Sequence, residues 1–232
     1  MFSNSSHRWH LFTLNGHKVY LEPWFLLLVA FFVFTGLRSA DVLFQQLLWV
    51  PILFLGVLWH EFGHAIAIKA YGYGGSTIIL QGFGGVAINE RRGNSPPGQS
   101  IMISLAGPGA SLLLAIGSFG ALYLYQGSLG WGSGNLLAYF LGLNGLVNLF
   151  WAVFNMLPIN PMDGGHVVLH GLRKFYSRPK AMLYSAYSSL ATLALLVLAA
   201  LAIGYTSLLL FALVFIFAAQ NVQIVQMVNR HR

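Results

Sequence analysis

Six apolar runs, most of them long enough to cross a bilayer, limit how this chain of 232 residues can fold. Hydrophobic residues make up 57% of it and charged residues only 7%, whereas soluble domains carry about 25% charged residues. A spanning helix needs roughly 20 apolar residues. The sequence therefore predicts an all-α polytopic membrane protein of about six transmembrane helices, forming one domain over residues 1–232. The predicted spans are residues 19–37, 42–71, 99–125, 135–157, 181–203 and 206–228.

The distribution of Lys and Arg along the chain agrees with the predicted spans. A formal net charge of +7 would suit a nucleic-acid partner. If the N-terminus lies in the cytosol, however, every Lys and Arg except Arg38 falls on the cytosolic side, as the positive-inside rule requires. This predicts a multi-pass cell-membrane protein with both termini cytosolic, the lipid bilayer as a partner, and no nucleic acid. Residues 1–20 lack the apolar stretch of a cleaved signal peptide, and without cysteine no thiolate metal site can form.

The second run contains His60, Glu61 and His64 in an H-E-x-x-H motif. Two histidines four residues apart share one helix face, so both imidazoles can bind one metal ion. The glutamate beside the first histidine is placed to act on a metal-bound water. Because ionisable groups inside a membrane are costly and usually functional, this pattern favours a zinc site over three polar residues satisfied in a core. The motif lies toward the cytosolic half of the run.

A glycine-rich stretch, residues 72–98, follows the motif. Residues 76–80 and 86–88 favour strands, and the glycines between them favour a turn. We expect a small β-hairpin or re-entrant loop packed beside the site, because irregular backbone at membrane depth must be buried in protein or line a wet cavity. A flexible surface loop is the alternative. Further on, the small residues of 106–111 are expected to let another helix approach closely.

A catalytic zinc site needs a third protein ligand, and the chain offers only five acidic residues. Asp163 lies in residues 158–165, where two prolines and two glycines rule out a regular helix. This combination favours Asp163 as the third ligand. Two alternatives stay open: Asp163 caps the short helix expected over residues 166–174, or His166 or His170 is the ligand instead.

Three motifs together resemble the site-2 protease family of intramembrane zinc metalloproteases. They are residues 60–64, residues 154–158 and residues 160–165, and the resemblance covers residues 42–174. It implies one zinc ion per chain and a substrate cut in or near a transmembrane helix of another membrane protein. It also implies specific roles: His60, His64 and Asp163 as zinc ligands, Glu61 as general base, Asn155 as a substrate-holding residue, and Gly82, Phe83, Gly84 and Gly85 as part of a substrate-binding β element. No stretch resembles a regulatory PDZ or CBS module.

Three other functions are compatible with parts of the pattern. A membrane metal transporter or channel would also place His and Asp in the bilayer, but it has no need of Glu61. A non-catalytic relative that binds membrane helices would not need the intact ligand set. A membrane zinc protease that cuts near the surface would take a downstream glutamate as ligand, and only Glu90 is available.

Overall fold

The computed structural model of the chain describes residues 8–36, 42–82, 84–89, 95–129 and 135–230. The chain divides into two compact units. The first comprises Met1–Gly93 and Ala106–Ala152, and the second comprises Asn94–Leu105 and Val153–Arg232.

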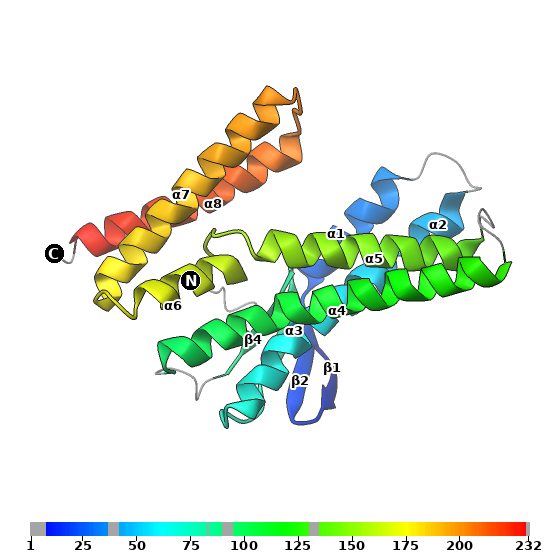
Figure 1. Ribbon diagram of the computed structural model, residues 1–232, viewed down its shortest axis with the longest axis horizontal. Coiled ribbons are helices and arrows are strands. Elements are labelled where there is room, and N and C mark those ends of the chain that lie inside the picture. Colours follow the sequence, from blue (N-terminus) through cyan, green and yellow to red (C-terminus); the bar gives the residue numbers. More distant parts are fainter. Residues whose placement is uncertain (1–7, 37–41, 83, 90–94, 130–134, 231–232) are drawn as a thin grey trace. The chain divides into compact units, whose positions relative to one another are not determined.

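The first unit combines a small sheet with apolar helices (Figure 1). Its strands are β1 (Trp9–Leu14), β2 (His17–Leu21), β3 (Thr77–Gln81) and β4 (Gly84–Ile88). Its helices are α1 (Pro23–Thr35), α2 (Leu43–Leu47), α3 (Trp49–Ala70) and most of α4 (Pro97–Leu129) and α5 (Leu136–Asn155).

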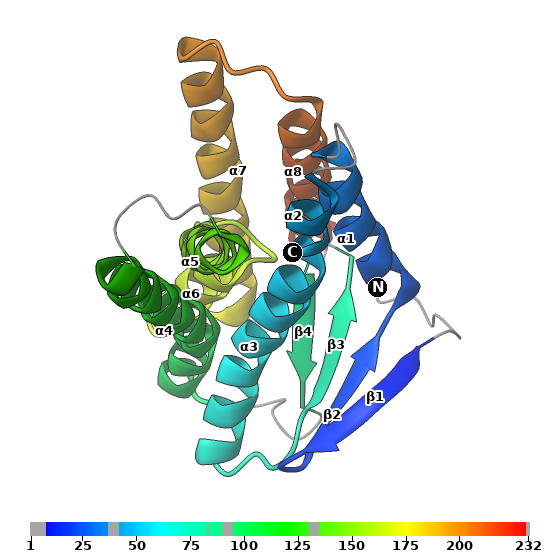
Figure 2. The ribbon, with the colours of Figure 1, turned by 90° about the vertical axis from the view of Figure 1, so that its right-hand side faces the viewer.

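The four strands form one sheet in the order β1-β2-β3-β4 (Figure 2). Strands β1 and β2 are antiparallel, as are β3 and β4, whereas β2 and β3 are parallel. The predicted hairpin within residues 72–98 is therefore present as β3 and β4. The other half of the sheet comes from the polar N-terminal segment. The prediction of an all-α fold with a single hairpin therefore missed two of the four strands, β1 and β2. Asn15 and Gly16 both have positive φ, 51° and 86°, as a two-residue hairpin turn of type I′ requires.

The core of the first unit lies between α3, α1 and the sheet. Buried Leu53 and Val57 of α3 belong to one apolar cluster with Phe25 of α1 and with Ile78 and Leu80 of β3. Both faces of β3 are therefore covered: three consecutive residues of this strand are buried. Figure 2 shows α3 running alongside the sheet, and α3 contacts both β3 and β4. The packing holds the hairpin against the helix that carries the H-E-x-x-H motif.

Five helices among the described residues are long and apolar enough to cross a membrane, which identifies a membrane protein. They correspond to the last five predicted spans and cover Leu43–Ala70, Pro97–Gly127, Leu136–Asn155, Arg178–Ala202 and Leu208–Arg230. The first predicted span, residues 19–37, is not confirmed as a spanning helix. Its first residues belong to β2, and α1 has 13 residues, about 20 Å of helix against a hydrocarbon core of about 30 Å.

The second unit contains α6 (Asp163–Leu172), α7 (Arg178–Ala202) and α8 (Leu208–Arg230). Helices α7 and α8 lie side by side (Figure 1). The turn between α5 and α6 packs on them, because Ile159 and Met162 join Leu193 of α7 and Phe217 of α8 in a second apolar cluster. Helix α6 begins at Asp163, three residues before the expected start.

Candidate metal centre

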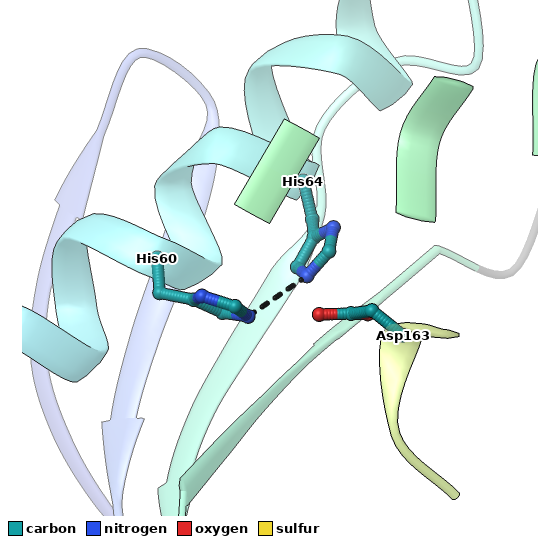
Figure 3. Close-up of side chains that lie close together, drawn as sticks. All are labelled: His60, His64 and Asp163. Carbon is teal, nitrogen blue, oxygen red and sulfur yellow. Dashed lines mark hydrogen bonds between the residues drawn. The ribbon is translucent and has the colours of Figure 1, made fainter. Parts of the chain in front are cut away.

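The two motif histidines lie one helical turn apart on α3 and face each other (Figure 3). Both are buried, and their Nε2 atoms are 3.2 Å apart. Two nitrogen ligands in a tetrahedral zinc site, each about 2.0–2.1 Å from the metal, are separated by about 3.3 Å. The spacing of His60 Nε2 and His64 Nε2 therefore fits a shared tetrahedral metal ion without movement of α3.

Helix α4 orients the first of these rings. Ser111 Oγ lies 3.0 Å from His60 Nδ1, and both residues are buried. A metal-binding histidine usually donates its second ring N–H to a neighbouring oxygen, which fixes the tautomer and the orientation of the ring. If His60 Nδ1–H donates to Ser111 Oγ, Nε2 carries the ring's lone pair and can act as a metal ligand. Ser111 is thus the residue that holds this ring.

The small residues of α4 make room for the motif, as residues 106–111 predicted. A Cβ at Gly107 would lie 2.2 Å from His64 Nε2 and 2.8 Å from His60 Nε2. A Cβ at Gly63 of α3 would lie 2.4 Å from the backbone oxygen of Ala106. Real Cβ contacts are not this short, so α3 and α4 approach at glycines because no side chain fits. The backbone of α4 at Gly107 lines the space in front of both imidazole nitrogens.

Glu61 is buried between its own helix and strand β4. Its side chain is 4% exposed, and a Cβ at Gly85 would lie 2.6 Å from Glu61 Cγ. The neighbouring Gly84 is less crowded: its Cβ would lie 3.6 Å from Trp151. Gly82, with φ of 45°, begins the tight turn that leads into β4. Of the glycine-rich segment named from the sequence, Phe83 lies outside the described residues.

Asp163 is the first residue of α6, in the second unit. The residue at the N-cap of α6 is Met162, and Asp163 follows it as an acidic residue in the first turn of the helix. The ligand atoms of His60, His64 and Asp163 all lie within 4.8 Å of one another (Figure 3). Within the described part of the chain these residues form a group of three potential metal ligands.

The two glycines after Asp163 let α6 begin directly against the preceding turn. A Cβ at Gly164 would lie 2.2 Å from the backbone oxygen of Met156, and one at Gly165 would lie 2.6 Å from the backbone nitrogen of Asn160. The turn before α6 is further closed by bonds from Met162 N to Ile159 O and from His166 N to Met162 O. Contacts between backbone atoms therefore hold the chain on both sides of Asp163.

The remaining candidates lie on the same elements. Asn155 is the last residue of α5. His166 and His170 lie on α6, and neither belongs to the group of three ligands found among the described residues. His170 Nδ1 is 3.2 Å from the guanidinium of Arg173.

Sequence reasoning missed Ser111 and Gly107 as individual members of the site. The only signal was the run of small residues at 106–111, which indicates close helix packing but names no partner. A serine spaced 51 residues from the histidine it contacts carries no local pattern.

The chain is similar to known zinc metalloproteases. The model of peptidase family M50 matches residues 131–199. The chain is 32% identical to a putative zinc metalloprotease of Synechocystis sp., over 67% of this chain and 42% of that protein. It is 29% identical to a zinc metalloprotease of Methanocaldococcus jannaschii, over 74% of this chain and 47% of that protein. The chain spans about half the length of these curated relatives.

A solved structure shares the fold. The site-2 protease from Methanocaldococcus jannaschii matches with a TM-score of 0.64 and 24% identity, covering 94% of this chain and 95% of that one. The apolar helices and the histidine pair on α3 agree with this similarity to membrane metalloproteases. The chain thus contains a region that matches peptidase family M50, is similar in sequence to zinc metalloproteases and shares its fold with a site-2 protease.

The space in front of the histidines gives a first prediction. Gly107→Ala places a methyl group on the Nε2 atoms of both rings, so we expect zinc affinity to fall at least about 10-fold, as for loss of an orienting contact. Gly109→Ala is the matched control, because a Cβ at Gly109 meets nothing within 4 Å. Zinc affinity of both purified variants is measured by competition with a chromophoric chelator. Equal affinities would show that α4 does not line the metal position.

Proposed function

We propose that this chain is a zinc metalloendopeptidase that hydrolyses a peptide bond in or near a transmembrane helix of another membrane protein. One observation carries the proposal: two buried histidines on an apolar helix present Nε2 atoms 3.2 Å apart, grouped with the carboxylate of Asp163. Buried ionisable residues in a membrane segment are costly and mark functional sites. The zinc metalloproteases among its relatives support the same chemistry.

The proposed ligands are His60, His64 and Asp163, with one zinc ion per chain. Two neutral imidazoles and one carboxylate leave the fourth position of a catalytic zinc site open. A zinc ion held by these three residues would supply Lewis-acid chemistry and a water that ionises near neutral pH. Ser111 holds the His60 ring through Nδ1.

Glu61 is the proposed general base. It follows His60 directly on α3, and its side chain is buried against Gly85 of β4. We propose that this carboxylate removes a proton from the attacking water and then delivers it to the leaving amine. Asn155, at the end of α5, is proposed to donate a hydrogen bond to the scissile carbonyl oxygen as negative charge develops there.

The proposed substrate contact is strand β4. It is an edge strand among the described strands, with β3 on its other side, and its Gly85 adjoins Glu61. An exposed edge can add an extended peptide by β-augmentation. A transmembrane helix must unwind before its carbonyls can be attacked, and pairing with β4 would hold the unwound segment beside the base. Residues 82–85 would then form the substrate-binding segment.

The proposed topology keeps both termini in the cytosol. Lys69 Nζ donates to Asn15 O at 2.9 Å, so the N-terminal hairpin turn lies at the C-terminal end of α3. From there β2 and α1 extend about 36 Å in total, close to the length of α3. Gly36, just after α1, lies against Gln46 of α2. A strand followed by a helix would thus replace the first predicted spanning helix and keep the number of crossings even.

The alternative of a metal transporter gains no support from the ligands. A transport path needs successive polar sites across the membrane, yet a single group of three potential ligands occurs among the described residues.

The role of the base is tested by Glu61→Gln. The variant keeps the size of the side chain but cannot accept a proton, so we expect zinc binding within a few-fold of wild type and a fall in cleavage of about 10²- to 10⁴-fold. Candidate single-span proteins are co-expressed with each form and cleavage is followed by immunoblot. Glu22→Gln, which changes a carboxylate paired with Arg8, is the control. Undiminished cleavage by Glu61→Gln would reject the assigned base.

The contact between β4 and the base gives a second test. Gly85→Ala puts a Cβ within 2.9 Å of three Glu61 atoms, so we expect kcat to fall at least about 10-fold while zinc remains bound. Gly117→Ala on α4, where a Cβ meets nothing within 4 Å, is the control and should stay near wild type. The measurement is kcat and KM on one cleaved substrate. Similar kcat values for both variants would show that the contact between β4 and Glu61 does not affect the reaction.

The topology is tested by single cysteines, because the chain has none of its own. Thr13→Cys, Ser177→Cys and Tyr205→Cys lie at exposed positions. With an impermeant maleimide on intact bacterial cells producing each variant, only the cysteine at 205 should react. The other two should react after the cells are opened. Labelling of position 13 in intact cells would place the N-terminal hairpin outside.

A further inference from the structure

The second unit contains a buried polar network that the proposed catalytic mechanism does not use. Asn160, Ser185, Ser189 and Asn221 are each at most 9% exposed. They come from three segments distant in the sequence: the turn before α6, helix α7 and helix α8. Side chains of this kind are expensive within apolar helices and are kept where they bond across segments.

The network converges on one residue of the turn. The backbone N–H of Asn160 donates to Ser189 Oγ at 2.9 Å, and its side-chain amide donates to Ser185 Oγ at 2.9 Å. The amide of Asn221 donates to the backbone oxygen of Asn160 at 2.9 Å. Both backbone polar groups of Asn160 are therefore satisfied by side chains of the C-terminal helices.

Some backbone groups of the turn bond within it, as Met162 N does to Ile159 O, but the N–H and the oxygen of Asn160 bond to side chains of α7 and α8. Residues 156–162 lie between two helices, so their polar backbone groups have no regular ladder to join, and each buried unpaired group would cost the full desolvation penalty. On the opposite side, Gly164 and Gly165 press α6 onto the same turn. The turn thus packs against α6 and is hydrogen-bonded to α7 and α8. Asp163 is the residue that directly follows this turn.

We propose that Asn160, Ser185 and Asn221 are positioning residues that fix the carboxylate of Asp163, so that α7 and α8 belong to the metal centre and are more than membrane anchors. This inference rests on the proposed role of Asp163 as a zinc ligand. It extends the site beyond the predicted core of residues 42–174. Asn221 also lies outside the region matched by the family model.

The test compares the full-length protein with Asn221→Leu, which removes the three hydrogen bonds of the Asn221 amide to Asn160 and Phe217, and with the milder Ser185→Ala. The control is Thr192→Val, because the Thr192 hydroxyl donates only to Ser188 O of its own helix. For each protein the zinc affinity is measured by chelator competition, and the thermal midpoint is measured without zinc. We expect zinc affinity to fall about 10- to 100-fold in both network variants and to stay at the wild-type value in Thr192→Val.

The two measurements separate the possible outcomes. A lower thermal midpoint with unchanged zinc affinity in both network variants would overturn the proposal, since the network would then serve the fold alone. If Asn221→Leu does not fold, the affinity of Ser185→Ala decides the question. Asp163→Asn is measured in parallel. Unchanged zinc affinity in that variant would reject the ligand set itself, whereas a loss there without a loss in the network variants would reject only the positioning role.

Discussion

Two imidazole rings buried in an apolar helix impose the strictest demand on this molecule. Each ring has two nitrogens that must find a partner, and no water is available in hydrocarbon to supply one. The two Nε2 atoms satisfy part of this demand by lying 3.2 Å apart, and Ser111 Oγ of α4 is the hydrogen-bond partner of His60 Nδ1. Helix α4 can reach that far only because Gly107 and Gly63 bring the two backbones together. The close packing of α3 and α4 thus follows from the need to satisfy the histidines.

Glycines position the site as much as larger side chains do. Glycine lies at each place where backbone meets a candidate functional group: Gly107 against the histidines, Gly85 against Glu61, and Gly164 and Gly165 against the turn before α6. Backbone atoms have few ways to move, so such contacts hold a side chain more rigidly than another flexible side chain would. Protein interiors respond to a single added methyl group for this reason. The proposed chemistry needs this rigidity, because small displacements of a reacting group are costly.

Features with a local signature could be predicted from the sequence. The histidine motif follows from residue spacing, and the last five spans follow from the length of the apolar runs. The β3–β4 hairpin follows from the glycines between two strand-favouring segments. The N-terminal strands were missed, although Asn15-Gly16 is a strong signal for a hairpin, because the polarity of residues 1–20 was interpreted only as evidence against a signal peptide. Ser111, Asn160 and Asn221 could not have been found. Their partners lie 25 to 61 residues away, and no local pattern encodes such pairs.

The parallel pairing of β2 with β3 has a consequence for biogenesis. Lys18 pairs with Thr77, so a ribosome must make about sixty more residues, including the whole of α3, before β2 meets its second neighbour. Domains generally fold from the N-terminus during synthesis, and pairing between distant strands is slow. Strand β2 therefore keeps one open edge until β3 has been synthesised. The sheet can be completed only after the helix that bears the histidines has been made.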